Sequence, residues 1–342
     1  MSFKIKIQQS GHEFEAEPSE KILDAAQRGG YTLSYNCRNG SCGTCKGRVV
    51  EGRVDYGNVD PTTLTEADKA EGLALFCQAT ALEDLVIDAE EIDAVQDIPI
   101  RIVPCRVARM EKLAHDVMGL WLSLPKNQRL QFLAGQYIDF LLKDGRRRSF
   151  SLANAPHNDE YLELQIRHVP GGYFTDHVFE KMKERDLLRF RGPLGTFFLR
   201  EDSDRPIIMV AGGTGFAPIK AMLEHLFDNE IRRPVHLYWG VRSKHDLYHA
   251  TLLEGWAREH EQFEFVPVLS EPQEEDVWHG RTGWVHEAVL EDFPDLSGYD
   301  VYASGPPVMI DSVRQSFFER GLAKKYFFSD SFEYAAESES KA

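Results

Sequence analysis

The sequence has few cysteines, little positive charge and no long hydrophobic run. No apolar stretch among the 342 residues approaches the ~20 residues that cross a bilayer. The first residues alternate polar and apolar side chains without an apolar signal core, so we expect a cytoplasmic protein. Because 39 Lys and Arg stand against 55 Asp and Glu, the composition argues against a nucleic-acid partner.

Length and charge distribution indicate several domains. A chain of 342 residues exceeds one ordinary core, and 42% hydrophobic with 27% charged residues is typical of globular proteins. Residues 1–98 carry 9 basic and 18 acidic side chains, whereas residues 99–200 carry 17 basic and 11 acidic ones. The excess of acidic over basic residues in the whole chain has two explanations, solubility alone or a functional role. The basic middle third favours an anionic ligand, docking to the acidic first third, or both.

Four of the five cysteines are grouped in one part of the chain. Cys37, Cys42 and Cys45 have C-x4-C-x2-C spacing, and Cys77 follows 32 positions after Cys45. This is the ligand spacing of plant-type [2Fe–2S] centres. Disulfides are disfavoured without a secretory signal, and a zinc site usually has two C-x-x-C pairs, of which only one is present. We therefore predict that these thiolates bind a [2Fe–2S] cluster.

The order of patterns along the chain predicts three regions. Residues 1–93 favour a mixed sheet with a hairpin over 3–16 and a short helix capped by Ser19, and residues 94–99 favour a linker. Residues 100–200 contain six short strand patterns, which are typical of an antiparallel barrel. Residues 201–342 alternate buried strands with helices, which predicts a parallel sheet covered on both sides.

Four short segments carry residues suited to nucleotide phosphates and flat rings. They are RSFS at 148–151, GGYFT at 171–175, GGTGFAP at 212–218 and SGP at 304–306. Glycines where a strand meets a helix expose N–H groups to a phosphate, and arginine can bind phosphate through paired hydrogen bonds. Each segment alone also fits an ordinary turn, and the G-x-G-x-x-G fingerprint is absent.

Together these motifs resemble known families. Residues 35–45 (YNCRNGSCGTC) resemble the cluster loop of plant-type ferredoxins. The four later segments are similar, in order, to the flavin and nicotinamide motifs of ferredoxin–NADP reductase-type enzymes. The whole chain resembles the NADH-dependent iron–sulfur flavoprotein reductases. This resemblance implies a multidomain α+β and α/β protein with a β-grasp ferredoxin domain at 1–93, an antiparallel six-stranded FAD-binding β-barrel at 100–200 and an NAD(P)H-binding α/β domain at 201–342.

The resemblance also implies roles for individual residues. Flavin would be held by Arg148, Ser149, Phe150, Ser151, Gly171, Gly172 and Thr175. The dinucleotide would be held by Gly212, Gly213, Thr214, Gly215, Pro218, Gly305 and Pro306. Ser151, Ser304 and Phe332 would lie at the reacting rings, Phe332 covering the flavin. Ser304 departs from the family, which has cysteine before Gly-Pro.

The coenzyme is predicted from charge. Glu271 follows a predicted strand, where a carboxylate can accept from a ribose hydroxyl and would repel the 2′-phosphate of NADPH. We therefore favour NADH, although Arg242 and Lys244 leave NADPH open. His245 and His249 are four apart, but no third ligand is evident, so we predict no metal site there.

The function implied is electron transfer from NADH through FAD and the [2Fe–2S] cluster to a partner protein. The partner would be a deoxysugar dehydrase, as for the CDP-6-deoxyhexose reductases, or the oxygenase component of an aromatic-ring dioxygenase or monooxygenase. The alternative of a different class is an iron–sulfur redox sensor or carrier that only binds nucleotide. We expect a monomer.

Overall fold

The computed structural model describes residues 2–332. Contacts divide the chain into two units, Met1–Pro99 with Gly195–Phe197, and Ile100–Leu194 with Phe198–Ala342. We describe each unit by itself. None of the helices within residues 2–332 has the length and apolar character that crossing a bilayer requires.

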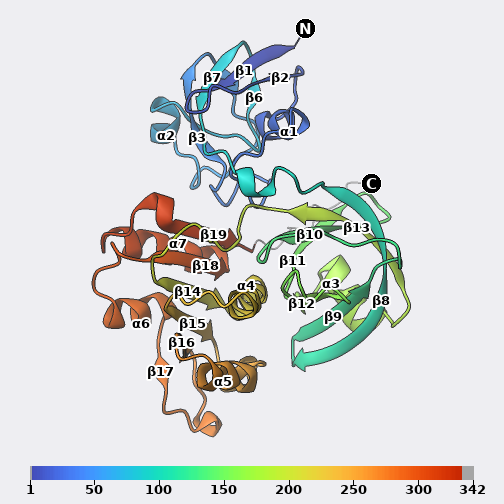
Figure 1. The fold of residues 1–342 in the computed structure, drawn as a ribbon, viewed down its shortest axis with the longest axis vertical. Helices are drawn as coiled ribbons and strands as arrows, with labels where there is room; N and C mark the ends of the chain where they lie inside the picture. The colour runs from blue at the N-terminus through green and yellow to red at the C-terminus, as the bar shows by residue number, and fades with distance from the viewer. Residues whose placement is uncertain (1, 333–342) are drawn as a thin grey trace. The chain divides into compact units, whose positions relative to one another are not determined.

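The first unit is a mixed sheet with short helices (Figure 1). The strand order is β2-β1-β7-β3-β5, and β1 pairs with β7 in parallel and with β2 antiparallel. The strands are β1 (Phe3–Ile7), β2 (Glu13–Ala16), β3 (Lys46–Glu51), β5 (Leu73–Leu75) and β7 (Leu85–Asp88), with a separate pair of β4 (Val54–Asp55) and β6 (Thr80–Ala81). The helices are α1 (Ile22–Arg28), α2 (Glu66–Ala70) and the 3₁₀ turn η1 (Asp93–Val95). Alternating strand residues such as Ile5 and Ile7 face Ile22 and Leu23 of α1 in one core.

The second unit begins with the predicted six-stranded antiparallel barrel. The strand order is β11-β10-β13-β8-β9-β12. A bridge between Leu152 and Leu164 joins the two edges, so the sheet closes on itself. The strands are β8 (Arg101–Ala114), β9 (Val117–Ser123), β10 (Tyr137–Leu141), β11 (Arg147–Ser151), β12 (Leu162–Arg167) and β13 (Leu187–Leu194), and the helix is α3 (Tyr173–Glu180). Burial of nearly every residue in β12 and in β10 fits strands whose inner face fills a small barrel.

The parallel α/β sheet follows in the order β17-β16-β15-β14-β18-β19. Its strands are β14 (Ile207–Gly212), β15 (Val235–Val241), β16 (Phe263–Leu269), β17 (Arg281–Thr282), β18 (Asp300–Gly305) and β19 (Phe327–Ser331). Its helices are α4 (Phe216–Asp228), α5 (Ala250–Glu259), α6 (Val285–Asp292) and α7 (Pro307–Phe318), with the 3₁₀ turns η2 (Gly213–Gly215), η3 (Lys244–Asp246), η4 (Glu274–Asp276) and η5 (Lys324–Tyr326). In Figure 1, α6 and α7 lie on one side of this sheet and α4 and α5 on the other.

The chain order reverses between β14 and β18, which are neighbours. In open parallel sheets, ligands bind outside the carboxyl ends of the strands at such a switch point. Residues 212–215 follow β14 and residues 304–306 end β18. The fold class predicted from the sequence is therefore confirmed, and the topology brings two of the predicted nucleotide segments to one edge.

Candidate cofactor sites

The four predicted cluster ligands converge in the first unit. Cys37, Cys42 and Cys45 lie on the loop between α1 and β3, and Cys77 lies directly after β5. Cys42, Cys45 and Cys77 are each 5% exposed, and Cys37 is half-buried. All four are free thiols. The loop therefore presents four sulfur donors in a closed environment.

The sulfur atoms contact one another in two pairs. A hydrogen bond from the Cys42 thiol, assisted by Ser41 and by backbone N–H groups, lowers the pKa of Cys37 to about 5 despite burial. Cys45 likewise lowers the pKa of Cys77 by a side-chain hydrogen bond. The backbone N–H of Cys42 also donates to Cys37 Sγ at 3.4 Å. Two irons with two thiolates each need such a paired set, so the residues present fit a [2Fe–2S] cluster.

Close backbone contacts hold this loop. Gly40 has φ +90°, and a Cβ there would lie 2.9 Å from the Asn58 carbonyl oxygen and from Gln78 Cγ. The side-chain amide of Gln78, next to Cys77, donates to the Arg38 carbonyl oxygen at 2.9 Å. The loop and the strand that supplies the fourth thiolate are thus fastened together.

Thr196 is a residue of this unit that the sequence analysis missed. Its hydroxyl accepts from the Tyr35 N–H at 2.9 Å and donates to the Tyr35 carbonyl at 2.8 Å. Its own N–H donates to the same carbonyl at 3.0 Å. Thr196 therefore fixes the backbone two residues before Cys37. Nothing in the sequence signals it, because the two residues are 161 positions apart.

The predicted flavin segment forms β11 of the barrel. The Ser151 hydroxyl donates to Asp330 Oδ2 at 3.1 Å, and the Ser149 hydroxyl donates to Asp139 Oδ1 at 2.6 Å. The Phe150 ring lies 5.5 Å from that of Phe174, at the start of α3. Strand alternation thus separates the two serines from the aromatic side chain. Asp330 was not among the predicted site residues.

The basic turn before β11 lies close to the second predicted flavin segment. The Arg146 guanidinium lies 4.4 Å from the centre of the Tyr173 ring, and Arg148 is half-buried beside it in sequence. Gly172 is the N-cap of α3, and the Thr175 hydroxyl donates back to the Val169 carbonyl at 3.0 Å. Cationic side chains and a helix N-terminus in one place suit an anionic group.

The two predicted nucleotide segments of the α/β sheet contact each other. A Cβ added to Gly215 would lie 2.0 Å from the Ser304 carbonyl oxygen. Gly305 has φ +155°, and a Cβ there would lie 3.1 Å from Gly212 Cα. The backbone N–H of Phe332 donates to the Gly305 carbonyl at 2.9 Å. The structure therefore brings Phe332 to the turn that ends β18.

The Ser304 hydroxyl is fully buried and has no hydrogen-bond partner among residues 2–332. In β19, Asp330 pairs with Ser304 in the sheet and accepts from Ser151 of the barrel. The three residues thus connect β11, β18 and β19. An unpartnered buried hydroxyl is unusual in a folded protein.

The residues that bear on coenzyme choice lie together. Glu271 follows β16 and is exposed, and its N–H donates to the Arg242 carbonyl at 2.8 Å. Lys244 Nζ donates to the Asp276 carbonyl at 3.2 Å. One acidic and two basic side chains therefore lie at this edge. The preference of this site for NADH over NADPH stays a prediction.

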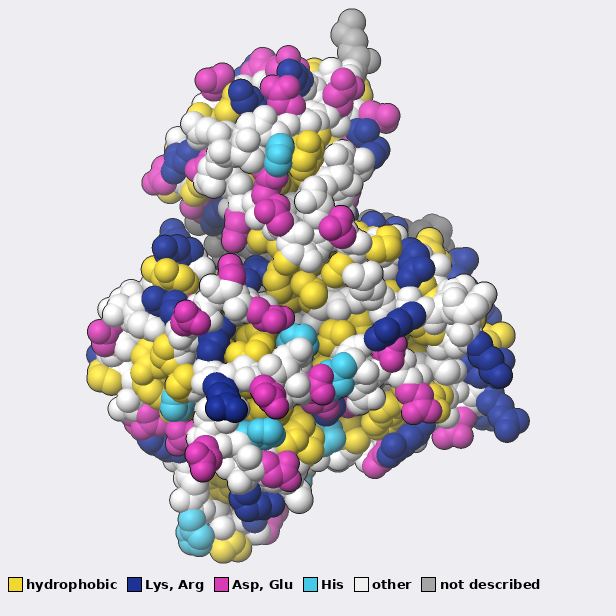
Figure 2. Space-filling view, in the orientation of Figure 1, with side chains coloured by type: hydrophobic (Ala, Val, Ile, Leu, Met, Phe, Trp, Pro, Cys, Tyr) yellow, Lys and Arg dark blue, Asp and Glu magenta, His cyan; other side chains and the backbone are white. Residues whose placement is uncertain are grey.

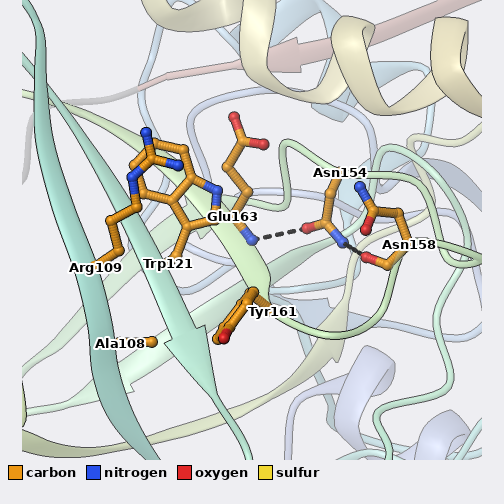
Figure 3. A pocket seen from close by; sticks show the side chains of 7 residues that line it. All are labelled: Ala108, Arg109, Trp121, Asn154, Asn158, Tyr161 and Glu163. Atoms are coloured by element: carbon orange, nitrogen blue, oxygen red, sulfur yellow. Dashed lines mark hydrogen bonds between the residues drawn. The ribbon is translucent and has the colours of Figure 1, made fainter.

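A separate hollow of about 300 Å³ opens on the outside of the barrel (Figure 3). Its lining residues are Ala108, Arg109, Trp121, Asn154, Asn158, Tyr161 and Glu163. None of the predicted site residues lines it. The Arg109 guanidinium lies over the Trp121 ring at 4.4 Å, and Asn154 accepts from the Glu163 N–H at 2.8 Å. The hollow therefore does not account for the predicted cofactor contacts.

Three family models match separate parts of the chain. Residues 5–82 match the 2Fe-2S iron-sulfur cluster binding domain, residues 104–199 the oxidoreductase FAD-binding domain, and residues 209–315 the oxidoreductase NAD-binding domain. These matches identify a [2Fe–2S] cluster, FAD and NADH as the cofactors.

Relatives match over almost the whole chain. The CDP-6-deoxy-L-threo-D-glycero-4-hexulose-3-dehydrase reductase of Yersinia pestis is 42% identical over 332 residues, which cover 97% of this chain and 99% of the relative. The phenol hydroxylase P5 protein of Acinetobacter pittii is 35% identical over 350 residues, 99% of this chain and 98% of the relative. The structure of the Amycolatopsis cytochrome P450 reductase GcoB has a TM-score of 0.79 at 34% identity and covers 96% of this chain and 98% of that one. The chain belongs to the family of NADH-dependent iron–sulfur flavoprotein reductases.

Proposed function

We propose that the electron acceptor of this reductase is a dehydrase that acts on a CDP-linked 6-deoxyhexulose. The observation that carries this proposal is the 42% identity to the Yersinia reductase, which extends over 97% of this chain and 99% of the relative. The phenol hydroxylase protein matches over a similar length at 35% identity. An oxygenase component is therefore the second candidate acceptor.

In this proposal, β11 and the loop before α3 hold the flavin. When bound, FAD takes a hydride from NADH, and a [2Fe–2S] cluster of this type carries single electrons at roughly −400 mV. Asp330 fixes the Ser151 hydroxyl, which would hydrogen-bond the flavin ring. Arg148 would bind the flavin phosphate, and Phe332 would cover the ring. These assignments rest on the convergence of β11, β18 and β19 described above.

The nucleotide corner would admit NADH between residues 212–215 and 304–306. Gly215 and Gly305 keep this corner free of side chains where the two backbones meet. Glu271 would accept a hydrogen bond from a ribose hydroxyl and disfavour a 2′-phosphate.

The variant Glu271→Gln should reduce the preference for NADH over NADPH, measured as the ratio of the kcat/KM values for the two coenzymes.

The acceptor is tested with the purified holoenzyme and NADH. First, anaerobic titration with NADH should bleach both the flavin and the cluster absorption bands. Next, one assay adds the dehydrase with its CDP-6-deoxyhexulose substrate, and a parallel assay adds a phenol hydroxylase oxygenase with phenol. The product of each assay is measured. Product from the dehydrase alone supports the proposal, whereas coupling to the oxygenase alone replaces it with the second candidate.

Two further readouts test the wider prediction. NADH-dependent reduction of cytochrome c should occur, and its absence from protein that contains both cofactors would favour a redox sensor or carrier. Because one chain contains all three domains, we also propose that the working unit is a monomer. Light scattering on the holoenzyme checks this, and a mass of twice the 39.0 kDa chain would contradict it.

A further inference from the structure

Two histidines and one aspartate meet at a place that the cofactor sites do not use. His115 lies in the turn between β8 and β9 of the barrel, and His245 and Asp246 lie in η3, which follows β15. Each side chain offers one ligand atom, and these atoms all lie within 4.8 Å of one another. His115 and His245 are about 58% and 59% exposed, whereas Asp246 is 20% exposed. These three side chains therefore lie at the surface, where an ion can reach them.

The distances are close to those of a metal site. Asp246 Oδ1 lies 3.5 Å from His115 Nδ1 and 3.3 Å from His245 Nε2. Tetrahedral zinc with bonds of ~2.0–2.1 Å places neighbouring ligand atoms roughly 3.3 Å apart. Two of the three separations already have this value. The third separation, between nitrogens of the two histidines, is at most 4.8 Å, and the two imidazole rings lie edge to face.

Ser243 orients two of the three ligands. Its N–H and hydroxyl both donate to Asp246 Oδ2 at 3.0 Å. Asp246 Oδ1 is therefore left to face the two histidines. Because its hydroxyl has one proton, the contact with His245 Nδ1 at 3.0 Å then requires the imidazole N–H to donate. That tautomer leaves a lone pair on Nε2, which lies 3.3 Å from Asp246 Oδ1 and 3.4 Å from the Ser243 hydroxyl oxygen. Partners that fix the outer atom of a ligand in this way are typical of metal sites.

The alternative is an ion pair between a protonated histidine and Asp246. That pair would satisfy one histidine, but it gives no reason for a second imidazole to be at the same carboxylate oxygen. Asp116, 3.8 Å from His115 Nδ1, is already paired with Arg167 at 2.9 Å. Two neutral imidazoles and one carboxylate are a donor set that suits zinc better than magnesium or calcium, which prefer oxygen.

We propose that His115, His245 and Asp246 bind Zn²⁺, with water in the fourth position. The bound ion links the β8–β9 turn of the barrel to the segment after β15 of the α/β sheet. His249, the other histidine of the pair in the sequence, takes no part, because it packs against Phe216 with ring centres 6.0 Å apart. The expectation that His245 lacks further ligands is revised, since the partners come from the neighbouring residue and from a turn 130 positions away.

The test is zinc binding by the holoenzyme, in which the cluster occupies the four clustered thiolates. Equilibrium dialysis with metal analysis should give about one zinc ion per chain at micromolar concentration. Zinc K-edge absorption spectroscopy should show nitrogen and oxygen ligands with the outer-shell scattering of two imidazoles and no sulfur. Sulfur ligands, or binding only at millimolar zinc, would overturn the proposal.

Variants locate the site. His115→Ala and His245→Ala should each weaken zinc binding by at least about tenfold, and Ser243→Ala should weaken it by roughly tenfold through loss of orientation. The control His279→Ala removes another exposed histidine of the same unit and should bind zinc like the parent protein. Unchanged affinity in a His115→Ala, His245→Ala double variant with normal flavin content would refute the site. None of these readouts depends on the identity of the electron acceptor.

Discussion

The resemblance to ferredoxin–NADP reductase-type enzymes implies a cysteine at the position of Ser304, and the Ser304 hydroxyl is buried without a partner among residues 2–332. A buried hydroxyl that makes no hydrogen bond is unfavourable, whereas a thiol behaves as a small hydrophobic group with little need for a partner. We predict that Ser304→Cys keeps full flavin content and keeps the rate constant of flavin reduction by NADH within about threefold. Stopped-flow absorbance measures that rate constant. An inactive variant with intact flavin would contradict the role given to this turn.

Lys220 is a buried charge in the second unit. Its ammonium group donates to Glu163 at 3.0 Å, to Glu224 at 2.6 Å and to the Ala153 carbonyl at 3.0 Å. The side chain is only 6% exposed. α4 is thereby joined to the barrel, and removing the cation would leave two carboxylates facing each other.

We predict that Lys220→Met destabilises the second unit by ~3–5 kcal/mol, the usual cost of leaving a buried ion pair without one partner. Thermal unfolding followed by flavin fluorescence measures the loss. Lys126→Met, which removes an exposed lysine, is the control and should unfold like the parent. Equal stability of the two variants would show that the three groups are not coupled.

The Lys220 ammonium group also predicts how stability depends on pH. Burial lowers the pKa of Lys220, but Glu163 and Glu224 outweigh it and raise the pKa above the ordinary 10.5. The folded state therefore binds this proton more tightly than the unfolded state. The stabilisation is complete below pH 10.5 and is lost as the pH rises through the higher folded pKa. Lys220→Met should show a smaller fall in unfolding temperature over that alkaline range than the parent protein.

The residues that could be predicted are those whose partners are near in sequence or whose spacing is diagnostic. Three of the four thiolates lie within nine residues, and a fixed ligand spacing makes the fourth recognisable. Asp330 and Thr196 could not be predicted, because they act through partners 179 and 161 positions away. Neither lies in a motif of its own, so only the folded chain shows that it belongs to a site.

Among the elements, strands of the barrel and the α/β alternation could be predicted from burial patterns. The predicted start of α1 was less accurate. Ser19 has φ 67°, and Lys21 is the N-cap without a side-chain hydrogen bond. Ile22 and Leu23 begin the helix because they fill the core under the sheet. Tertiary packing thus determines this helix more than local capping does.

The contact between η2 and the end of β18 gives a prediction at the same scale. Because a Cβ at Gly215 would lie 2.0 Å from the Ser304 carbonyl oxygen, Gly215→Ala must push the two backbone turns apart. We expect KM for NADH to rise by at least about tenfold, as expected when backbone positions at a nucleotide corner shift. Steady-state kinetics with cytochrome c measures KM. Gly298→Ala, where a Cβ meets nothing within 4 Å, is the control and should leave KM unchanged.

For the whole molecule, the division into two units agrees with the distribution of chemistry. All four cluster thiolates lie in the first unit, and all predicted flavin and dinucleotide residues lie in the second. Figure 2 shows acidic side chains across the visible surface of the first unit, in line with the excess of acidic over basic residues in its sequence. The two redox functions should therefore be separable by mutation.

We predict that Cys77→Ala abolishes electron delivery but not flavin reduction. Loss of one of four thiolates should prevent cluster assembly, whereas the contacts that hold β11, β18 and β19 together lie entirely within the second unit. NADH should then bleach the flavin band at the parental rate, while reduction of cytochrome c falls at least about a hundredfold.

The control for this variant is Cys105→Ala. Burial raises the pKa of Cys105 to about 12, so it stays a neutral thiol in the barrel core, and its variant should keep both activities. Rapid cytochrome c reduction by Cys77→Ala would mean that electrons leave directly from the flavin and that the cluster is not on their path.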